Sequence, residues 1–336
     1  MKKKNPLIKL LVPLIILASF LNGCSGTQSS STSAKSETAK PQKIQLDYAY
    51  YSPLSLVLKE KGWVEEEFKK EGIPVEYVLS QGSNKALEFL NSNSIDFGST
   101  AGGAALMAKA KGNPIETVYI SSKPEWTALL TGNSSSIQNV KDLKGKKVAA
   151  TFGTDPHIFL LRSLSKANIK PSDVEIINLQ HANGAQALAT GQVDAWAGLD
   201  PHMAKSELEA NTHIFYRNPS FNTFGVVNVR SEFAKQYPAY VEKIIALYEK
   251  ARKYTLEHPD EAIKILAKSA NLSESVAKRE FERTDFTQSI PGDQLRNALL
   301  PAAVILQETK IIDPSLNKEK IINELIQPAY AKKAIQ

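Results

Sequence analysis

The stretch Lys147–Leu161, KVAATFGTDPHIFLL, decides how this chain folds. Its first half is a short apolar run of strand length, which Gly153 interrupts. Asp155-Pro156 then predicts the start of a helix, because Asp is a preferred cap and proline is favoured at the first helical position. A strand that leads directly into a helix leaves free backbone N–H groups at the positive end of the helix dipole, where an anion can bind. Several other strand ends in the chain follow the same pattern.

The same alternation of short strands and helices occurs twice. It runs from Ile44 to Ile120 and starts again at Val148, which predicts one α/β unit built twice, each with a mostly parallel sheet and right-handed crossovers. Strand-like crossing segments begin at Trp126 and near Phe224, so we expect lobe 1 at residues 44–125, lobe 2 at 126–223 and a return to lobe 1 at 224–336. Two lobes joined by two strands enclose a cleft that can open and close, with strand carboxyl ends facing it.

The expected elements follow from periodicity and from Gly and Pro positions. Strands are expected at 44–50, 75–79, 95–97, 116–120, 126–131, 148–151, 174–179, 193–197, 214–216 and 224–229. Helices are expected at 53–69, 156–166, 183–190, 233–257, 260–270, 273–281, 293–310 and 317–326, with further helices after Gln81-Gly82-Ser83, after the glycine-rich segment 98–103 and after Asp200-Pro201. After Arg230 only helices are expected, which pad the first lobe and the hinge.

Composition limits the class of partner. The chain has 336 residues, 42% of them hydrophobic and 23% charged, which is ordinary for a globular protein and enough for two lobes. Four of the six formal positive charges come from lysines among the first nine residues, which leaves +2 for the remainder. No basic cluster with interleaved aromatic residues is present, and this argues against nucleic-acid binding.

The N-terminus has the composition of an export signal. A lysine-rich start leads into an apolar run at 10–21, too short to span a bilayer, and then Leu21-Asn-Gly-Cys24, which resembles a bacterial lipoprotein signal. We therefore expect a signal peptide at 1–23, lipidation of Cys24, and a flexible tether at 24–43 that holds the folded part at the cell membrane on its extracytoplasmic side. Cys24 is the only cysteine, so a disulfide or a thiolate metal site within the chain is excluded.

The common enzyme motifs are absent from the sequence. It contains no Gly-x-Gly-x-x-Gly, phosphate-loop, His-Glu-x-x-His or Cys-x-x-Cys pattern, and its five histidines stand singly. The segment Gly98–Gly102 has the outline of a nucleophile elbow, but Thr100 stands where that motif places serine. We expect no catalytic residue, no metal ion and no cofactor.

The turns expected at the cleft are instead rich in hydroxyl and amide groups, with glycines that let a ligand approach the backbone. The candidate ligand-binding residues are Tyr51, Ser52, Gln81, Ser83, Ser99, Thr100, Ala101, Gly153, Thr154, His157 and Asn183, together with Trp126, Trp196 and Phe224 as an aromatic wall, and Asp200. His181 is a further candidate for a hydrogen bond. The alternative for Ser52, Ser83, Asp155, Asn183 and Asp200 is that they only cap helices, and for the tryptophans that they only fill the core.

Three segments carry a family resemblance: Asn93–Thr100 (NSIDFGST), Val140–Ala149 (VKDLKGKKVA) and Val193–Pro201 (VDAWAGLDP). Over residues 44–330 the chain resembles substrate-binding components of ABC importers, in particular the nitrate/sulfonate/taurine class and its aliphatic-sulfonate binders. The resemblance implies a type II periplasmic-binding-protein topology, a closing cleft and delivery to a membrane permease. It supports Ser99, Thr100, Gly153, Thr154, Trp196 and Asp200 as site residues. Relatives often carry a second bulky aromatic residue where this chain has Gly198-Leu199.

The expected function is a monomeric, membrane-anchored binding protein of an ABC importer, with permease and ATPase subunits as partners. Its ligand is expected to be a small organic anion, such as an aliphatic sulfonate or taurine, held by backbone amides and hydroxyl groups. One alternative is a neutral or cationic ligand, such as a thiamine-precursor pyrimidine, held by Asp200 and the tryptophans. A pyrimidine-precursor synthase is disfavoured because the chain lacks a cysteine-rich segment, and a transcription regulator because it carries an export signal.

Overall fold

The computed structural model describes residues 40–335, which belong to one compact unit. The predicted signal peptide, the lipidation site at Cys24 and most of the tether lie outside the described residues. Within 40–335 no helix is both long enough and apolar enough to cross a membrane.

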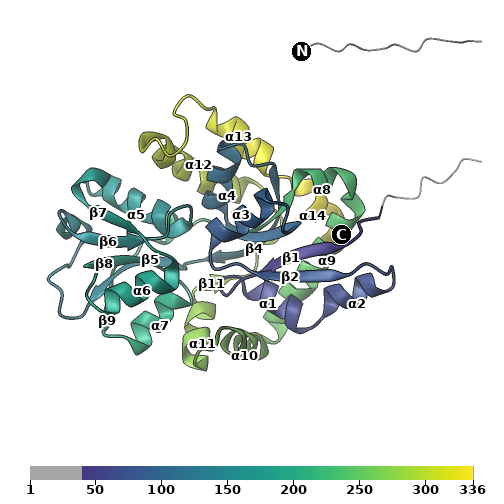
Figure 1. Ribbon diagram of the computed structural model, residues 1–336, viewed down its shortest axis with the longest axis horizontal. Coiled ribbons are helices and arrows are strands. Elements are labelled where there is room, and N and C mark those ends of the chain that lie inside the picture. Colours follow the sequence, from purple (N-terminus) through teal and green to yellow (C-terminus); the bar gives the residue numbers. More distant parts are fainter. Residues whose placement is uncertain (1–39, 336) are drawn as a thin grey trace, which may run out of the picture. The chain divides into compact units, whose positions relative to one another are not determined.

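Two β-sheets form the centres of two lobes (Figure 1). The six-stranded sheet of lobe 1 has the order β11-β4-β10-β3-β1-β2, and the five-stranded sheet of lobe 2 has the order β7-β6-β8-β5-β9. The strands of lobe 1 are β1 (Ile44–Tyr48), β2 (Val75–Leu79), β3 (Phe97–Ala101), β4 (Ile115–Pro124), β10 (Gly225–Arg230) and β11 (Thr284–Asp285). The strands of lobe 2 are β5 (Thr127–Gly132), β6 (Lys147–Ala150), β7 (Glu175–Asn178), β8 (Ala195–Leu199) and β9 (Thr212–Tyr216).

Five strands of each sheet share one topology, and β11 of lobe 1 has no counterpart in lobe 2. In lobe 1 the first strand lies between the second and third, and β10 enters antiparallel between β3 and β4. In lobe 2 the strands β6 to β9 repeat this order, and β5 enters antiparallel between β8 and β9. Each sheet is therefore mixed, because one of its strands comes from a crossing segment. The duplicated unit expected from the sequence is confirmed.

Helices cover both faces of the lobe 1 sheet (Figure 1). One face carries α1 (Pro53–Glu60), α2 (Trp63–Lys69), α8 (Ser231–Gln236), α9 (Pro238–Glu257), α10 (Pro259–Ala270), α11 (Glu274–Glu282) and α14 (Pro328–Ile335). The other face carries α3 (Ser83–Asn91), α4 (Gly102–Ala110), α12 (Asp293–Glu308) and α13 (Lys318–Leu325). The C-terminal helices thus complete the core of lobe 1, as the sequence predicts.

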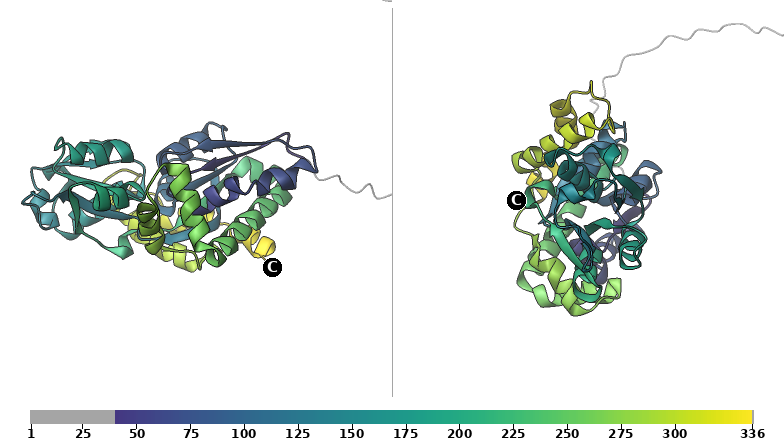
Figure 2. Two further views of the ribbon diagram at one scale, coloured as in Figure 1. Left: turned by 90° about the horizontal axis from the view of Figure 1, so that it is seen from below. Right: turned by 90° about the vertical axis from the view of Figure 1, so that its left-hand side faces the viewer.

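The lobe 2 sheet is covered in the same way, and Figure 2 shows the two lobes side by side. One face packs against α5 (Asp155–Lys166), and the other packs against α6 (His181–Ala189) and α7 (His202–Glu209). Short 3-10 helices occupy Val140–Leu143, Pro171–Asp173 and Pro219–Phe221.

Apolar contacts join the lobes on one side of the crossing segments. Met107 of α4, Ile158 of α5 and Leu306 of α12 belong to one buried cluster. A Cβ atom on Gly103 would lie 2.9 Å from Ile158 Cδ1 and 3.1 Å from Asp155 Oδ1, so α4 and α5 approach each other closely at this glycine. The N-termini of α4 and α5 are consequently packed against each other.

Several boundaries differ from the sequence prediction. The helix expected at 53–69 is two helices, because Gly62 adopts a left-handed conformation with φ of 65°. The helix expected at 233–257 is interrupted before Pro238, where proline begins α9. The helix α14 was not expected. The prediction that the glycine-rich segment 98–103 is a turn that leads into a helix is wrong for residues 98–101. These residues continue β3, because β10 pairs with all of them.

Candidate ligand-binding site

A cavity of about 290 Å³ lies between the two lobes. It is formed where four strands give way to helices: β1 to α1 and β2 to α3 in lobe 1, and β7 to α6 and β8 to α7 in lobe 2. The lining residues are Tyr50, Tyr51, Leu79, Ser80, Gln81, Gln180, His181, Ala182, Asn183, Leu199, Asp200, Pro201 and His202. The volume is at the small end of the roughly 300–1,000 Å³ range of ligand pockets, which suits a small molecule.

Helix N-termini from both lobes meet at this cavity. Within the described part of the chain, α1, α3 and α6 have no side-chain hydrogen bond at their N-caps. The α7 terminus differs, since the Asp200 carboxylate accepts a hydrogen bond from the Ala204 N–H at 2.8 Å. Uncapped N-termini present N–H donors and the positive end of the helix dipole, so this end of the cavity favours an acceptor-rich, negatively charged group.

Polar side-chain atoms in the cavity wall also lack partners. His181 is 1% exposed, and its Nδ1 lies 3.1 Å from Thr151 Oγ1. Its Nε2, together with Ser80 Oγ and Gln180 Oε1, has no hydrogen-bond partner among residues 40–335. Because buried polar groups are nearly always paired, these atoms are places where a ligand or water molecule can bind.

Burial keeps the two histidines of the cavity neutral at pH 7. It lowers the pKa of His181 to about 3, with a further effect from His202, and it lowers the pKa of His202 to about 4. Burial also raises the pKa of Asp200 to about 6, against the opposing effect of Arg283. Among the described lining residues, Asp200 is therefore the one that carries a formal charge at neutral pH.

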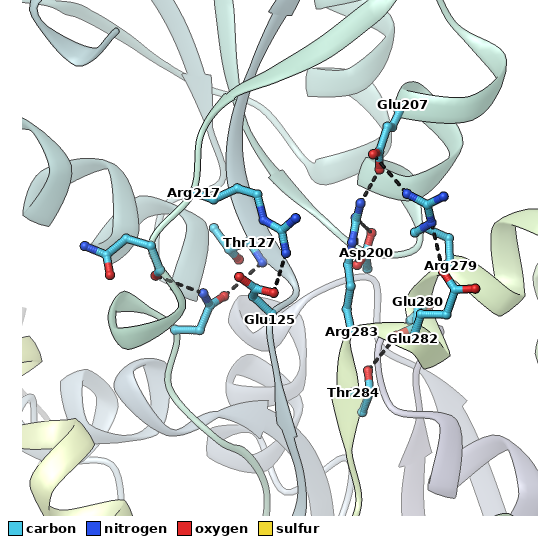
Figure 3. A network of polar contacts seen from close by, with 12 residues as sticks. Glu125, Thr127, Asp200, Glu207, Arg217, Arg279, Glu280, Glu282, Arg283 and Thr284 are labelled. Carbon is cyan, nitrogen blue, oxygen red and sulfur yellow. Dashed lines mark hydrogen bonds and ion pairs between the residues drawn. The ribbon is translucent and has the colours of Figure 1, made fainter.

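That charge is balanced by Arg283, which follows α11 (Figure 3). Arg283 Nη1 lies 3.4 Å from both carboxylate oxygens of Asp200, and both side chains are largely buried. Arg283 also pairs with Glu207 of α7, and Glu207 pairs with Arg279 at 3.2 Å. Helix α11, which packs on lobe 1, is thus joined to α7 of lobe 2 by ion pairs beside the cavity.

The structure brings five of the predicted residues to the cavity: Tyr51, Gln81, His181, Asn183 and Asp200. Ser52 follows Tyr51 directly and is buried, and its Oγ has no partner among the described residues. The other predicted residues do not line the cavity, and these are Ser83, Ser99, Thr100, Ala101, Trp126, Gly153, Thr154, His157, Trp196 and Phe224.

The group around Ser99 to Ala101 lies in β3 and binds protein atoms. Ser99 N–H donates to Asp47, and Ala101 N–H donates to Ser83 Oγ. Thr100 Oγ1 donates to the Ala101 carbonyl and accepts from Asn228. Most of these hydrogen-bonding groups are therefore used within lobe 1, because Ser99–Ala101 are strand residues rather than turn residues. The buried Ser99 Oγ is the exception, since it has no partner among residues 40–335.

The α5 N-terminus is likewise occupied by protein. Asp155 accepts hydrogen bonds from Trp126 Nε1 at 3.0 Å and from the Thr223 hydroxyl at 2.7 Å. Thr223 Oγ1 also accepts from Gly103 N–H at the start of α4. Gly153, Thr154 and His157 lie beside this contact, which the second crossing segment closes. Asp155 accepts hydrogen bonds that join separate segments of the chain. The N-terminus of α5 is therefore not an open anion-binding site in this structure.

The aromatic candidates are core residues in this structure. Trp196 is fully buried among lobe 2 side chains, and Trp126 and Phe224 belong to the buried cluster beneath α3 and α4. Trp126 contacts the cavity only indirectly, since its ring lies edge-on to Tyr51 at 6.1 Å between centroids.

Sequence reasoning missed most of the cavity wall. The residues not put forward as site residues are Tyr50, Leu79, Ser80, Gln180, Ala182, Leu199, Pro201 and His202. Each lies within a few residues of the carboxyl end of β1, β2, β7 or β8, so the general rule for ligand sites in open α/β sheets contained the signal. No group of three or more His, Cys, Asp or Glu in residues 40–335 is arranged to hold a metal ion.

Comparison with known proteins places this geometry in a family. The family model described as NMT1/THI5 like matches residues 53–262, more than half of the chain. The chain belongs to the NMT1/THI5-like family. This NMT1/THI5-like protein is 28% identical over 326 residues to a protein of Bacillus subtilis named putative aliphatic sulfonates-binding protein, and the match covers 96% of each chain.

A solved structure confirms the two-lobed periplasmic-binding-protein fold. The alkanesulfonate-binding protein of Xanthomonas axonopodis pv. citri, bound to MOPS, superposes with a TM-score of 0.77 at 24% identity, over 86% of this chain and 99% of that one. A yeast enzyme, the 4-amino-5-hydroxymethyl-2-methylpyrimidine phosphate synthase of Saccharomyces cerevisiae, is 24% identical over 70% of this NMT1/THI5-like chain and 72% of its own. The proteins similar to this chain therefore include both binding proteins and an enzyme.

Proposed function

We propose that this protein is the extracytoplasmic substrate-binding component of an ABC importer and that it captures a small aliphatic sulfonate, such as taurine or a short alkanesulfonate. The observation that carries the proposal is the cavity between the lobes, where uncapped helix N-termini of both lobes meet. The naming of the Bacillus subtilis relative and of the Xanthomonas structure supports a sulfonate over other anions.

The chemistry of the wall supports an anion held without a cationic side chain. Neutral His181, Ser80 and the backbone N–H groups of α3 and α6 offer hydrogen bonds to sulfonate oxygens. Charge-assisted hydrogen bonds contribute about 1.5–3 kcal/mol each, so several of them together with burial of the alkyl chain are needed to offset the ordering costs and reach the roughly −8 kcal/mol of micromolar binding. Leu79, Leu199 and Pro201 give apolar surface for a short alkyl chain.

We further propose that Cys24 is lipidated and that the tether holds the protein at the membrane, where permease and ATPase subunits receive the ligand. The protein works as a monomer in this proposal, because both sides of the cavity come from one chain. Intact mass measurement of protein extracted from membranes tests the anchor, since a lipidated form begins at Cys24 and carries acyl chains.

A thermal-shift screen tests the ligand class. The protein is mixed in turn with ethanesulfonate, butane-1-sulfonate, taurine, nitrate and bicarbonate. A ligand at a hundred times its Kd stabilises the folded state by about 2.7 kcal/mol. We expect the sulfonates to raise the melting temperature and nitrate and bicarbonate to have no effect. A screen in which no sulfonate binds removes the sulfonate proposal.

A blocking variant with a matched control locates the site. Ala182 is an exposed cavity residue in the first turn of α6, and Ala189 is exposed at the end of the same helix, outside the cavity. Ala182→Trp should weaken sulfonate binding at least tenfold, because the indole fills the cavity mouth, whereas Ala189→Trp should bind like the wild type. Equal binding by the two variants would place the ligand elsewhere.

One observation favours a second ligand class. Tyr50, Tyr51, His181 and His202 line the cavity, and Asp200 stands beside them. Aromatic rings stack on a planar heterocycle, and a carboxylate accepts hydrogen bonds from its amino group. An aminopyrimidine related to thiamine precursors is therefore the alternative, in line with the yeast enzyme in the family. Isothermal titration with 4-amino-5-hydroxymethyl-2-methylpyrimidine and with butane-1-sulfonate decides between the two.

A further inference from the structure

We infer that Arg283 determines the charge selectivity of the cavity: as a positioning residue outside the wall, it neutralises Asp200 and so lets the site accept an anion. This inference rests on the proposed function and names the residue that makes an anionic ligand compatible with a wall containing a carboxylate.

The backbones of Asp200 and Arg283 are hydrogen-bonded to adjacent residues of the first crossing segment. Asp200 N–H donates to the Trp126 carbonyl at 2.9 Å, and Glu125 N–H donates to the Arg283 carbonyl at 2.7 Å. Their charged groups meet at 3.4 Å, with Asp200 1% and Arg283 6% exposed at the side chain. Figure 3 shows Arg283 reaching from the end of α11 to Asp200 and to Glu207.

Arg283 does not line the cavity, so its effect on a ligand passes through Asp200. A helix and a strand on either side of this residue fix its backbone: α11 ends at Glu282, and β11 pairs with β4 at Thr284 and Asp285. This placement holds the guanidinium next to Asp200.

Charged and titratable groups face Asp200 from several elements. Glu280 lies in α11, and Arg283 follows that helix directly. Glu207 and His202 lie in α7, and His181 lies at the N-terminus of α6. Tyr50 and Tyr51 face the cavity from lobe 1. Glu280 is 3% exposed, and burial together with the charge of Asp200 raises its pKa well above the usual range. Glu207 is shared between Arg283 and Arg279. Arg283 is thus the cation in direct contact with Asp200.

Loss of Arg283 has a defined consequence. Asp200 keeps its hydrogen bond from Ala204 but loses its counter-ion, so its pKa rises, and above that pKa the wall carries an unpaired buried negative charge. This charge then repels an anionic ligand, so the affinity for the ligand should fall as the pH rises. A ligand with an amino group should be affected less.

The experiment measures binding of butane-1-sulfonate at pH 6 to 9 to wild type, Arg283→Met, Arg283→Lys and the double variant Asp200→Asn/Arg283→Met. Methionine keeps the length without the charge, and asparagine keeps the oxygen that accepts from Ala204. We expect affinity to fall about tenfold between pH 6 and 9 in Arg283→Met. We expect less than threefold change in wild type, Arg283→Lys and the double variant.

A second arm uses the proteins without ligand. A buried carboxyl whose folded pKa is raised loses stability as the pH rises through that pKa. The melting temperature of Arg283→Met should therefore fall more steeply between pH 6 and 9 than that of wild type, and the double variant should remove the difference.

The outcomes separate the two proposals. A loss of binding in Arg283→Met that is independent of pH and persists in the double variant overturns the inference, because it means a structural role or a direct ligand contact. If wild type binds no anion, the proposed function fails, and melting profiles that coincide for wild type and Arg283→Met overturn the charge assignment separately.

Discussion

Asp200 and Arg283 face each other at 3.4 Å, and their backbones are hydrogen-bonded to neighbouring residues, Trp126 and Glu125, of the segment that crosses between the lobes. Rotation of the lobes about this segment moves atoms close to it least. The Asp200–Arg283 pair is therefore positioned to persist while the lobes open and close. A second ion pair, between Glu207 and Arg279, also joins α7 to α11.

The contact between α7 and α11 can be tested at Glu207. Glu207→Gln removes one of the charged partners of each of Arg283 and Arg279, so we expect a loss of about 1–2 kcal/mol in the free energy of unfolding. Glu209→Gln, on the same helix, changes only an exposed contact with Ser273 and should cost less than about 0.5 kcal/mol. Urea denaturation of the two variants measures this, and equal losses would show that the ion pairs do not stabilise the lobe contact.

The hydroxyl of Thr223 joins three segments at the second crossing. Thr223→Val should destabilise the fold by about 1–3 kcal/mol, because Gly103 N–H and Asp155 lose a buried partner. Thr255→Val is the matched control: this threonine is equally buried, but its hydroxyl only donates to the Ala251 carbonyl within α9, and its loss should cost less than about 1 kcal/mol. Chemical denaturation curves give both values, and a Thr223→Val variant as stable as the control contradicts the assigned role.

Gly184 allows α6 to pack on Trp196. A Cβ atom there would lie 2.6 Å from Trp196 Nε1, and the indole is fully buried, so Gly184→Ala should cost about 1–3 kcal/mol by overpacking. Gly132→Ala adds a Cβ whose nearest neighbour is 3.9 Å away and should change stability by less than about 0.5 kcal/mol. Thermal unfolding of the pair measures the difference, which vanishes if α6 can shift without cost.

The buried carboxyl of Asp47 should make the folded state less stable as the pH rises. Burial raises its pKa to about 7, despite hydrogen bonds that include the Ser99 N–H. In the unfolded chain Asp titrates near 3.9, so the folded state binds the extra proton, and stability declines as the pH rises through about 7. Asp47→Asn, which cannot ionise, should lessen the decline between pH 5 and 8 by about 1 kcal/mol or more. Melting temperatures across that range test this, and parallel curves for wild type and variant would contradict it.

Local pattern was sufficient for most of the fold. Val75–Leu79 was predicted residue for residue, and the strands at 116–120 and 224–229 differ only at their ends, because alternation and flanking Gly or Pro residues are properties of a few neighbours. Gly98–Ala101 was mispredicted for the same reason. Its glycine and hydroxyl content is typical of a turn, but pairing with β10, more than a hundred residues later, extends the strand.

The candidate site was predicted less well than the fold. The sequence indicates which strands end in helices, and so it predicted Tyr51, Gln81, His181, Asn183 and Asp200 at the cleft. It does not indicate which of those ends remain free. Thr154 and Asp155 have the expected local geometry, yet their helix start is sealed by Thr223 and Trp126.

The sequence by itself therefore determined the two α/β units, the two crossings and the helical C-terminal region, since each follows from periodicity within a short window. Only the tertiary structure decided that α4 and α5 pack N-terminus to N-terminus through Gly103 and Ile158, while α1, α3, α6 and α7 surround the cavity. It also brought Arg283 to Asp200 across 83 residues of chain. The physical reason is that packing between lobes depends on the shapes and charges of surfaces assembled from distant segments, which no local pattern records.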